Sequence, residues 1–169
     1  DLESGDYALA TSEAGYKSAV TVFSSGGKQR FKWASPDYYF QAAALSADGK
    51  RLAIAAFRQN GTTFESTLFF RDLDSEVITG QVSLGSSAPL AVGFLDDDTV
   101  CVVGDYQTTV VSRKGKIMHE MHYATGDLVA YCFGDGSAAL DEAARGRALV
   151  GLVRRKGLEL LPWTPELRQ

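Results

Sequence analysis

The feature that most constrains this chain is a β-hairpin pattern centred on Asp48-Gly49. The dipeptide lies between two apolar runs, residues 40–45 and 52–57, and glycine at this place supplies the positive φ angle that a tight turn needs. Weaker copies of the pattern begin near Gly5, Phe94 and Cys132. Recurrence at a spacing of roughly forty residues predicts a repeat protein built from hairpins.

A second pair of strand-like segments follows the hairpin in each unit. In the first unit these segments are residues 19–23 and 29–33, and residues 24–28 form the turn between them. Four short strands per unit predict an all-β fold of β-propeller-like repeats, whose blades are four-stranded antiparallel sheets. We expect a single domain over residues 1–169, a partial propeller of about four units, at residues 1–34, 35–84, 85–123 and 124–163. The first unit lacks an obvious innermost strand before Tyr7.

Residues 137–155 fit two alternatives. Leu140, Ala144, Ala148 and Leu152 share the spacing of one helical face. Glycines within the segment disfavour a helix, and the repeat pattern predicts a strand pair that turns near residues 144–146. We therefore expect strands here and retain the helix as the rival.

Composition narrows the functional classes. The chain is 45% hydrophobic and 22% charged, which is ordinary for a globular domain. Its 17 basic and 21 acidic residues give a formal net charge of −4, which argues against a nucleic-acid partner. No apolar stretch approaches the length of a membrane helix, so we expect no membrane contact from this fragment itself.

The hairpin motif also carries a family resemblance. Residues 46–54, Ser-Ala-Asp-Gly-Lys-Arg-Leu-Ala-Ile, resemble the Ser-Pro-Asp-Gly-Lys-Arg-Leu-Ala motif of TolB-type, WD-like propeller repeats. From Tyr7 to about Tyr131 the chain resembles uncharacterised bacterial membrane-anchored β-propeller-like proteins, in which Ser35-Pro-Asp-Tyr-Tyr39 is a familiar segment. The resemblance implies an extracytoplasmic place in the cell envelope and assigns no activity. The first residue is Asp1, not Met, and we expect a processed or excised piece.

The two cysteines leave two alternatives open. Cys101 and Cys132 lie in apolar strand patterns of successive units and could be neighbours, so a disulfide is geometrically possible. Buried free cysteine is common in protein cores, and we favour that interpretation.

Three clusters invite a metal interpretation. His119 and His122 flank Glu120, but side chains three positions apart in a strand point to opposite faces. The acidic groups Asp96-Asp97-Asp98 and Asp72, Asp74 and Glu76 lack the order of a calcium loop. Aspartate is also a favoured turn residue. We therefore expect no metal site.

Side chains for recognition are more evident than side chains for catalysis. The sequence contains no nucleophile elbow, phosphate loop or Cys-x-x-Cys pair, so we expect no catalytic residues and no cofactor. In a propeller, the loops that lead into each blade lie on the same rim of the disc as the loops that join the second and third strands of each blade. With the strands assigned as above, the side chains on this rim would be Tyr16, Tyr38, Tyr39, Arg58, Tyr106 and Tyr123. Tyrosine and arginine are frequent interface anchors, although Trp33, Tyr38 and Tyr39 could instead wedge between blades.

The leading hypothesis is a non-catalytic recognition or scaffold module that binds a protein or cell-wall ligand. Bare strand edges would also permit an edge-to-edge homodimer. The alternative is a propeller-type enzyme, a hydrolase or lyase, with its site at the central channel. Small or apolar side chains at inner positions such as Ala42, Ala44, Val92 and Ala130 disfavour that alternative. A structural spacer between a membrane anchor and another domain is a third possibility.

Overall fold

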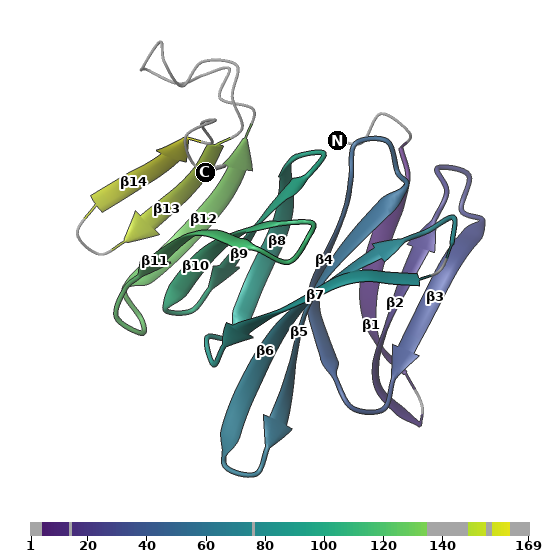
Figure 1. Ribbon diagram of the computed structural model, residues 1–169, viewed down its shortest axis with the longest axis horizontal. Coiled ribbons are helices and arrows are strands. Elements are labelled where there is room, and N and C mark those ends of the chain that lie inside the picture. Colours follow the sequence, from purple (N-terminus) through teal and green to yellow (C-terminus); the bar gives the residue numbers. More distant parts are fainter. Residues whose placement is uncertain (1–4, 14, 76, 135–148, 155–156, 163–169) are drawn as a thin grey trace.

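The structure, a computed structural model, describes residues 5–13, 15–75, 77–134, 149–154 and 157–162. These residues form four antiparallel sheets that stand side by side, and they contain no helix (Figure 1). Strands that are neighbours in a sheet are also neighbours in the chain, so each sheet is a meander of hairpins. The predicted all-β fold with blade-like antiparallel sheets is confirmed at this level.

Within the described residues, two sheets have four strands and two have three. The first contains β1 (Tyr7–Glu13), β2 (Tyr16–Phe23) and β3 (Gln29–Ser35). The second contains β4 (Tyr39–Leu45), β5 (Arg51–Asn60), β6 (Thr63–Asp72) and β7 (Val77–Gly85). The third contains β8 (Pro89–Asp96), β9 (Thr99–Gly104), β10 (Gln107–Ser112) and β11 (Ile117–His122). The fourth contains β12 (Leu128–Gly134), β13 (Leu149–Arg154) and β14 (Gly157–Pro162).

The structure decides in part between the helix and the strands that the sequence allows at residues 137–155. Strand β13 covers Leu149–Arg154 and pairs antiparallel with β12 and β14, as the strand alternative expects. The proposed turn near residues 144–146 lies outside the described residues.

The β4–β5 turn confirms the hairpin that the sequence predicts. Gly49 has φ of 68°, and its N–H donates to the Ser46 carbonyl at 2.9 Å. The Asp48 carboxylate accepts hydrogen bonds from the Ser46 hydroxyl at 2.6 Å and the Lys50 N–H at 3.0 Å. The Ser46 hydrogen bond, followed by that from Lys50, lowers the pKa of the Asp48 carboxyl.

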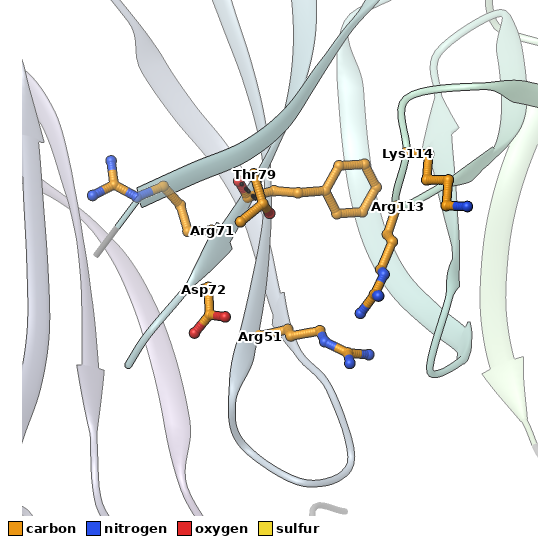
Figure 2. A pocket seen from close by; sticks show the side chains of 7 residues that line it. Arg51, Arg71, Asp72, Thr79, Arg113 and Lys114 are labelled. Atoms are coloured by element: carbon orange, nitrogen blue, oxygen red, sulfur yellow. Dashed lines mark hydrogen bonds between the residues drawn. The ribbon is translucent and has the colours of Figure 1, made fainter. Parts of the chain in front are cut away.

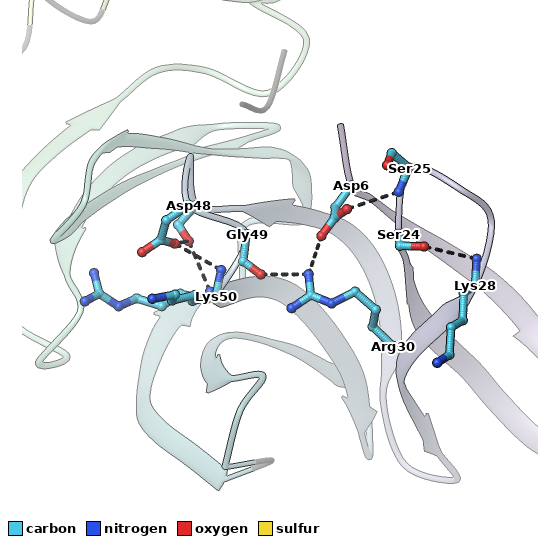
Figure 3. Close-up of polar contacts among 10 residues, drawn as sticks. Asp6, Ser24, Ser25, Lys28, Arg30, Asp48, Gly49 and Lys50 are labelled. Carbon is cyan, nitrogen blue, oxygen red and sulfur yellow. Dashed lines mark hydrogen bonds and ion pairs between the residues drawn. The ribbon is translucent and has the colours of Figure 1, made fainter. Parts of the chain in front are cut away.

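An arginine ties this turn to the first sheet (Figure 3). The Arg30 guanidinium of β3 donates to the Gly49 carbonyl at 3.0 Å and forms an ion pair with the Asp6 carboxylate. Asp6 in turn accepts the Ser25 N–H at 3.1 Å. Polar contacts therefore join the first and second sheets at one end of the strands.

Apolar side chains from both faces of the central strands fill the spaces between sheets. In β5, Leu52 and Ile54 pack toward the first sheet, whereas Ala53 and Ala55 pack toward the third. The two sets alternate because successive side chains of a strand point to opposite faces. Full burial of one large aliphatic side chain contributes about 1.5–3 kcal/mol, so these contacts are the main attraction between sheets.

The same alternation recurs in β9. Val100 and Val102 pack toward the second sheet, and Cys101 and Val103 pack toward the fourth, where Leu152 is fully buried. Strand β4 contacts both β1 and β8, and the Tyr131 hydroxyl of β12 donates to the Leu90 carbonyl of β8 at 3.3 Å. The leading strands of successive sheets are thus neighbours, as Figure 1 shows for β1, β4 and β8.

Two turns with the same hydrogen bonds relate the first sheet to the third. In the β2–β3 turn, Ser24 N–H donates to the Lys28 carbonyl at 2.8 Å, and Lys28 N–H donates to the Ser24 hydroxyl at 3.2 Å. The β10–β11 turn repeats both contacts with Ser112 and Lys116, at 2.8 and 3.2 Å. Strands β2 and β3 therefore correspond to β10 and β11, and within the described residues the first sheet has no counterpart of β8.

No helix in the described part of the chain has the length and apolar character required to cross a membrane.

Candidate functional site

The longest hairpin of the second sheet carries a group of exposed aromatic rings. Strands β5 and β6 have ten residues each, and their shared end projects beyond the neighbouring strands in Figure 1. The turn residue Gly61 has φ of 62°, and the Thr63 hydroxyl donates to the Asn60 carbonyl at 2.9 Å. The Asn60-Gly61 pair therefore forms the turn at the tip of the hairpin.

Three rings near this tip form what we call the aromatic patch: Tyr39, Phe57 and Phe64. Tyr39 of β4 lies directly opposite Phe57 of β5, and the rings stack with centroids 5.1 Å apart at 22°. The Phe57 and Phe64 rings meet edge to face, with centroids 6.0 Å apart. Tyr39 is 40% exposed and Phe64 is 50% exposed, so the patch presents aromatic surface to solvent.

Cationic side chains border the patch. The Lys17 ammonium lies 5.2 Å from the centroid of the Tyr39 ring, and the Arg58 guanidinium carbon lies 5.2 Å from that of Tyr38. Arg58 Nε donates to Glu65 Oε2 at 2.9 Å, and Asn60 Nδ2 donates to Glu65 Oε1 at 2.9 Å. The Glu65 hydrogen bond raises the pKa of Arg58, and the bonds from Asn60 and then Arg58 lower the pKa of Glu65. Both groups keep their charges at neutral pH.

The structure brings together three of the six side chains proposed from the sequence. Tyr38, Tyr39 and Arg58 lie at this end of the second sheet, and Tyr16, 50% exposed, precedes Lys17 at the start of β2. Tyr38 also packs edge-on against the buried Phe69 ring, with centroids 5.1 Å apart, so it is both a wedge and a surface side chain.

The remaining two lie in connections of the third sheet, Tyr106 between β9 and β10 and Tyr123 directly after β11. The Tyr106 hydroxyl contacts the Ser86 hydroxyl, and the Tyr123 side chain is buried in the core between the third and fourth sheets. Burial leaves Tyr123 unavailable to a surface ligand. Trp33 wedges between the first two sheets, with its ring 4.8 Å from Phe40 and 5.1 Å from Phe69.

Sequence reasoning did not identify Lys17, Phe57 or Phe64 as patch residues. The register set by the Asp48-Gly49 turn, with Leu45 opposite Leu52, would pair Phe57 with Phe40. An irregularity between Phe40 and Ala42 shifts the pairing by one residue, so that Tyr39 lies opposite Phe57. Turn chemistry alone therefore does not predict this pair. The position of Lys17 depends on how the first sheet docks against the second, which strand periodicity does not specify.

A second candidate, which we call the cationic pocket, lies between the second and third sheets (Figure 2). It is a cavity of about 310 Å³ lined by Arg51, Phe70, Arg71, Asp72, Thr79, Arg113 and Lys114. Arg51 and Arg113 turn their guanidinium groups toward each other, whereas Arg71 points away, over the Phe31 and Trp33 rings at 5.0 and 4.8 Å.

Several of the groups considered for metal binding have local partners. His122 Nε2 lies 3.7 Å from the Glu120 carboxylate, and the strand register places His119 on the opposite face, as predicted. The Asp72 and Asp96 carboxylates accept the N–H groups of Asp74 and Asp98 at 3.0 and 2.8 Å, which is turn geometry. Glu76 lies outside the described residues.

Cys101 is a buried free cysteine, so the structure contains no disulfide at this position. Desolvation by burial raises the pKa of its thiol to about 12.

A family model described as "Family of unknown function (DUF5711)" matches residues 2–137. No curated protein is significantly similar to the chain in sequence. The fold is similar to that of a crystal structure of a protein of unknown function from Bacteroides caccae, with a TM-score of 0.54 and 12% identity. The match covers 88% of this chain and 51% of that chain, so this chain spans about half the length of the solved protein. At this identity the likeness concerns the fold alone.

Proposed function

The chain belongs to DUF5711, a family of unknown function, and we propose that it is a non-catalytic recognition module of the bacterial cell envelope. Its aromatic patch would bind a protein or a cell-wall ligand. The observation that carries this proposal is the exposure of Tyr39 and Phe64 at the projecting β5–β6 tip. The envelope location rests on the resemblance of the chain to membrane-anchored bacterial proteins.

The patch has the chemistry of a recognition surface. Tyr39 of β4 and Phe64 of β6 are 40% and 50% exposed, although β5 between these strands buries Leu52 and Ile54 completely. Aromatic side chains offer a large contact area at a low entropic cost, and they supply much of the binding energy of interfaces. The bordering Lys17 and Arg58 add charge that favours an acidic or hydroxyl-rich partner.

We further propose that the sheets are blades of a propeller. The shared turn of β2–β3 and β10–β11 and the neighbouring positions of β1, β4 and β8 support this arrangement. A strand beside the free edge of β1 would complete the first blade, because β4 and β8 hold that place in the next two sheets. A second copy of the chain could supply it by edge-to-edge pairing, which sedimentation equilibrium would detect as a dimer.

The binding test uses purified peptidoglycan sacculi and envelope-protein extracts as separate probes. The Phe64→Ala and Tyr39→Ala substitutions should each reduce co-sedimentation with the bound probe at least fivefold, because each removes a ring of the patch. Ile117→Ala is the matched control, since Ile117 is 39% exposed on β11 of another sheet. Binding to neither probe, or equal binding by all variants, would exclude the patch as the recognition surface.

A further inference from the structure

We propose that the cationic pocket is a second binding site, whose ligand is a small organic anion held through phosphate or carboxylate oxygens by Arg51 and Arg113. The site is separate from the aromatic patch. Arg51 begins β5 beside the β4–β5 turn, whereas the patch residues Phe57 and Phe64 lie near the opposite end of the same hairpin.

The charge of the pocket is the first argument. Four of its seven lining residues are cationic and one is acidic, in a chain whose net charge is −4. Arg71 and Lys114 direct their charged groups away in Figure 2, but the guanidinium groups of Arg51, from the second sheet, and Arg113, from the third, approach each other at the cavity. Like charges that gather in a concave site repel one another, and an anion bound between them relieves that repulsion.

An internal carboxylate already shows where an oxyanion can lie. Asp98 Oδ1 is 3.2 Å from Arg113 Nε and 3.9 Å from Arg51 Nη1, so one oxygen is within ion-pair reach of both guanidinium groups. The Asp98 side chain is 72% exposed, and an exposed ion pair of this kind is weak. A ligand oxyanion can therefore replace it and use the fork geometry of arginine.

The pocket is also held in shape before any ligand binds. Arg51 Nη1 donates to the Asp97 carbonyl at 2.7 Å, and the Arg113 N–H donates to the Asp98 carbonyl at 2.8 Å. A Cβ atom on Gly80 would lie 2.8 Å from the Arg113 carbonyl oxygen, so the β10–β11 turn approaches β7 as closely as glycine permits. Preorganised groups lose less freedom on binding, which favours affinity.

Size and lining define the ligand class. A cavity of about 310 Å³ is near the lower end for small-molecule sites. Phe70 supplies apolar surface and Thr79 a hydroxyl, which already donates to the Phe70 carbonyl at 3.3 Å. A short carbon skeleton with one or two oxyanion groups fits these features.

The test is titration of the whole chain with succinate and with inorganic phosphate, followed by backbone-amide NMR and calorimetry. Glycerol, which is uncharged, is the negative control. We expect saturable shifts at the amides of Arg113 and Lys114 with at least one anion, and the stronger of the two identifies the oxyanion. Saturation by neither anion, or shifts spread evenly over basic residues elsewhere, would overturn the proposal.

Four substitutions sharpen the test. Arg113→Gln should weaken binding at least tenfold, and Lys114→Gln, on the exposed turn, provides a second pocket variant should the first fold poorly. Asp98→Asn should tighten binding about threefold because it removes the competing carboxylate. Asp37→Asn changes net charge equally at the other end of β4 and should leave binding unchanged. Equal effects of Asp98→Asn and Asp37→Asn would show that only net charge matters and would contradict a built site.

Discussion

The hydroxyl of Tyr123 donates a hydrogen bond to the backbone carbonyl of Gly104, which joins the segment after β11 to the end of β9. The Tyr123 oxygen has one proton, so the Thr108 hydroxyl, 3.0 Å away, donates to it. The backbone N–H of Tyr123 donates to the Tyr106 carbonyl at 3.0 Å. These contacts hold Tyr123 in place and tie the chain after β11 to the end of β9.

Tyr123→Phe should lower the free energy of unfolding by about 1–2 kcal/mol, because it leaves buried hydrogen-bonding groups without their partner. Urea denaturation measures this change. Tyr106→Phe is the matched control, since its hydroxyl contacts Ser86 at the exposed surface and its loss should cost less than about 0.5 kcal/mol. Equal losses for the two variants would contradict the structural role of Tyr123.

Gly80→Ala should destabilise the chain by about 1–3 kcal/mol, because the new methyl group would force the β10–β11 turn away from β7. It should also shift the amide resonances of Arg113 and Lys114. Gly26→Ala serves as control, since the nearest atom to its Cβ position is the Ser24 hydroxyl at 3.9 Å. Thermal unfolding of both variants gives the comparison, and an unaffected Gly80→Ala would show that the turn is not pressed against the strand.

The Cys101 thiol should resist alkylation in the folded protein. With a pKa of about 12, about one part in ten thousand is thiolate at about pH 8, and burial also blocks access. Mass spectrometry of peptides after iodoacetamide treatment reports Cys101 separately from Cys132. Labelling should become rapid after unfolding in guanidinium chloride. Fast labelling of Cys101 under native conditions would contradict the burial of β9.

Stability should fall in acid partly through Asp48. The folded-state pKa of its carboxyl is below the ordinary 3.8, so the charged form is favoured by folding. This contribution is present above pH 3.8 and is lost as pH falls through the lower folded-state value. Asp48→Asn should therefore be less stable than the parent near neutral pH, and the difference should shrink in acid. A difference that stays constant during an acid titration followed by circular dichroism would refute this assignment.

Local signals in the sequence sufficed for the hairpins but not for the contacts between sheets. The Asp48-Gly49 turn and its flanking strands are encoded within a dozen or so residues, so turn chemistry and apolar runs predict them. Arg51 and Arg113 meet only because the second and third sheets pack together. The spacing of apolar residues along the strands does not predict the distance between Arg51 and Arg113. Tyr123 was expected on the rim, yet the chain after β11 turns back toward Gly104 and buries it.

Alternating contacts along β5 and β9 constrain how this chain can evolve. Ile54 and Ala55 are adjacent in the chain but fit against different neighbours, and the same holds for Cys101 and Val102. Duplicating, deleting or exchanging one sheet would therefore bring together surfaces that were shaped for other partners. Growth or shrinkage of the array requires compensating substitutions on both newly apposed faces, which makes such rearrangements far less accessible than changes in the projecting loops.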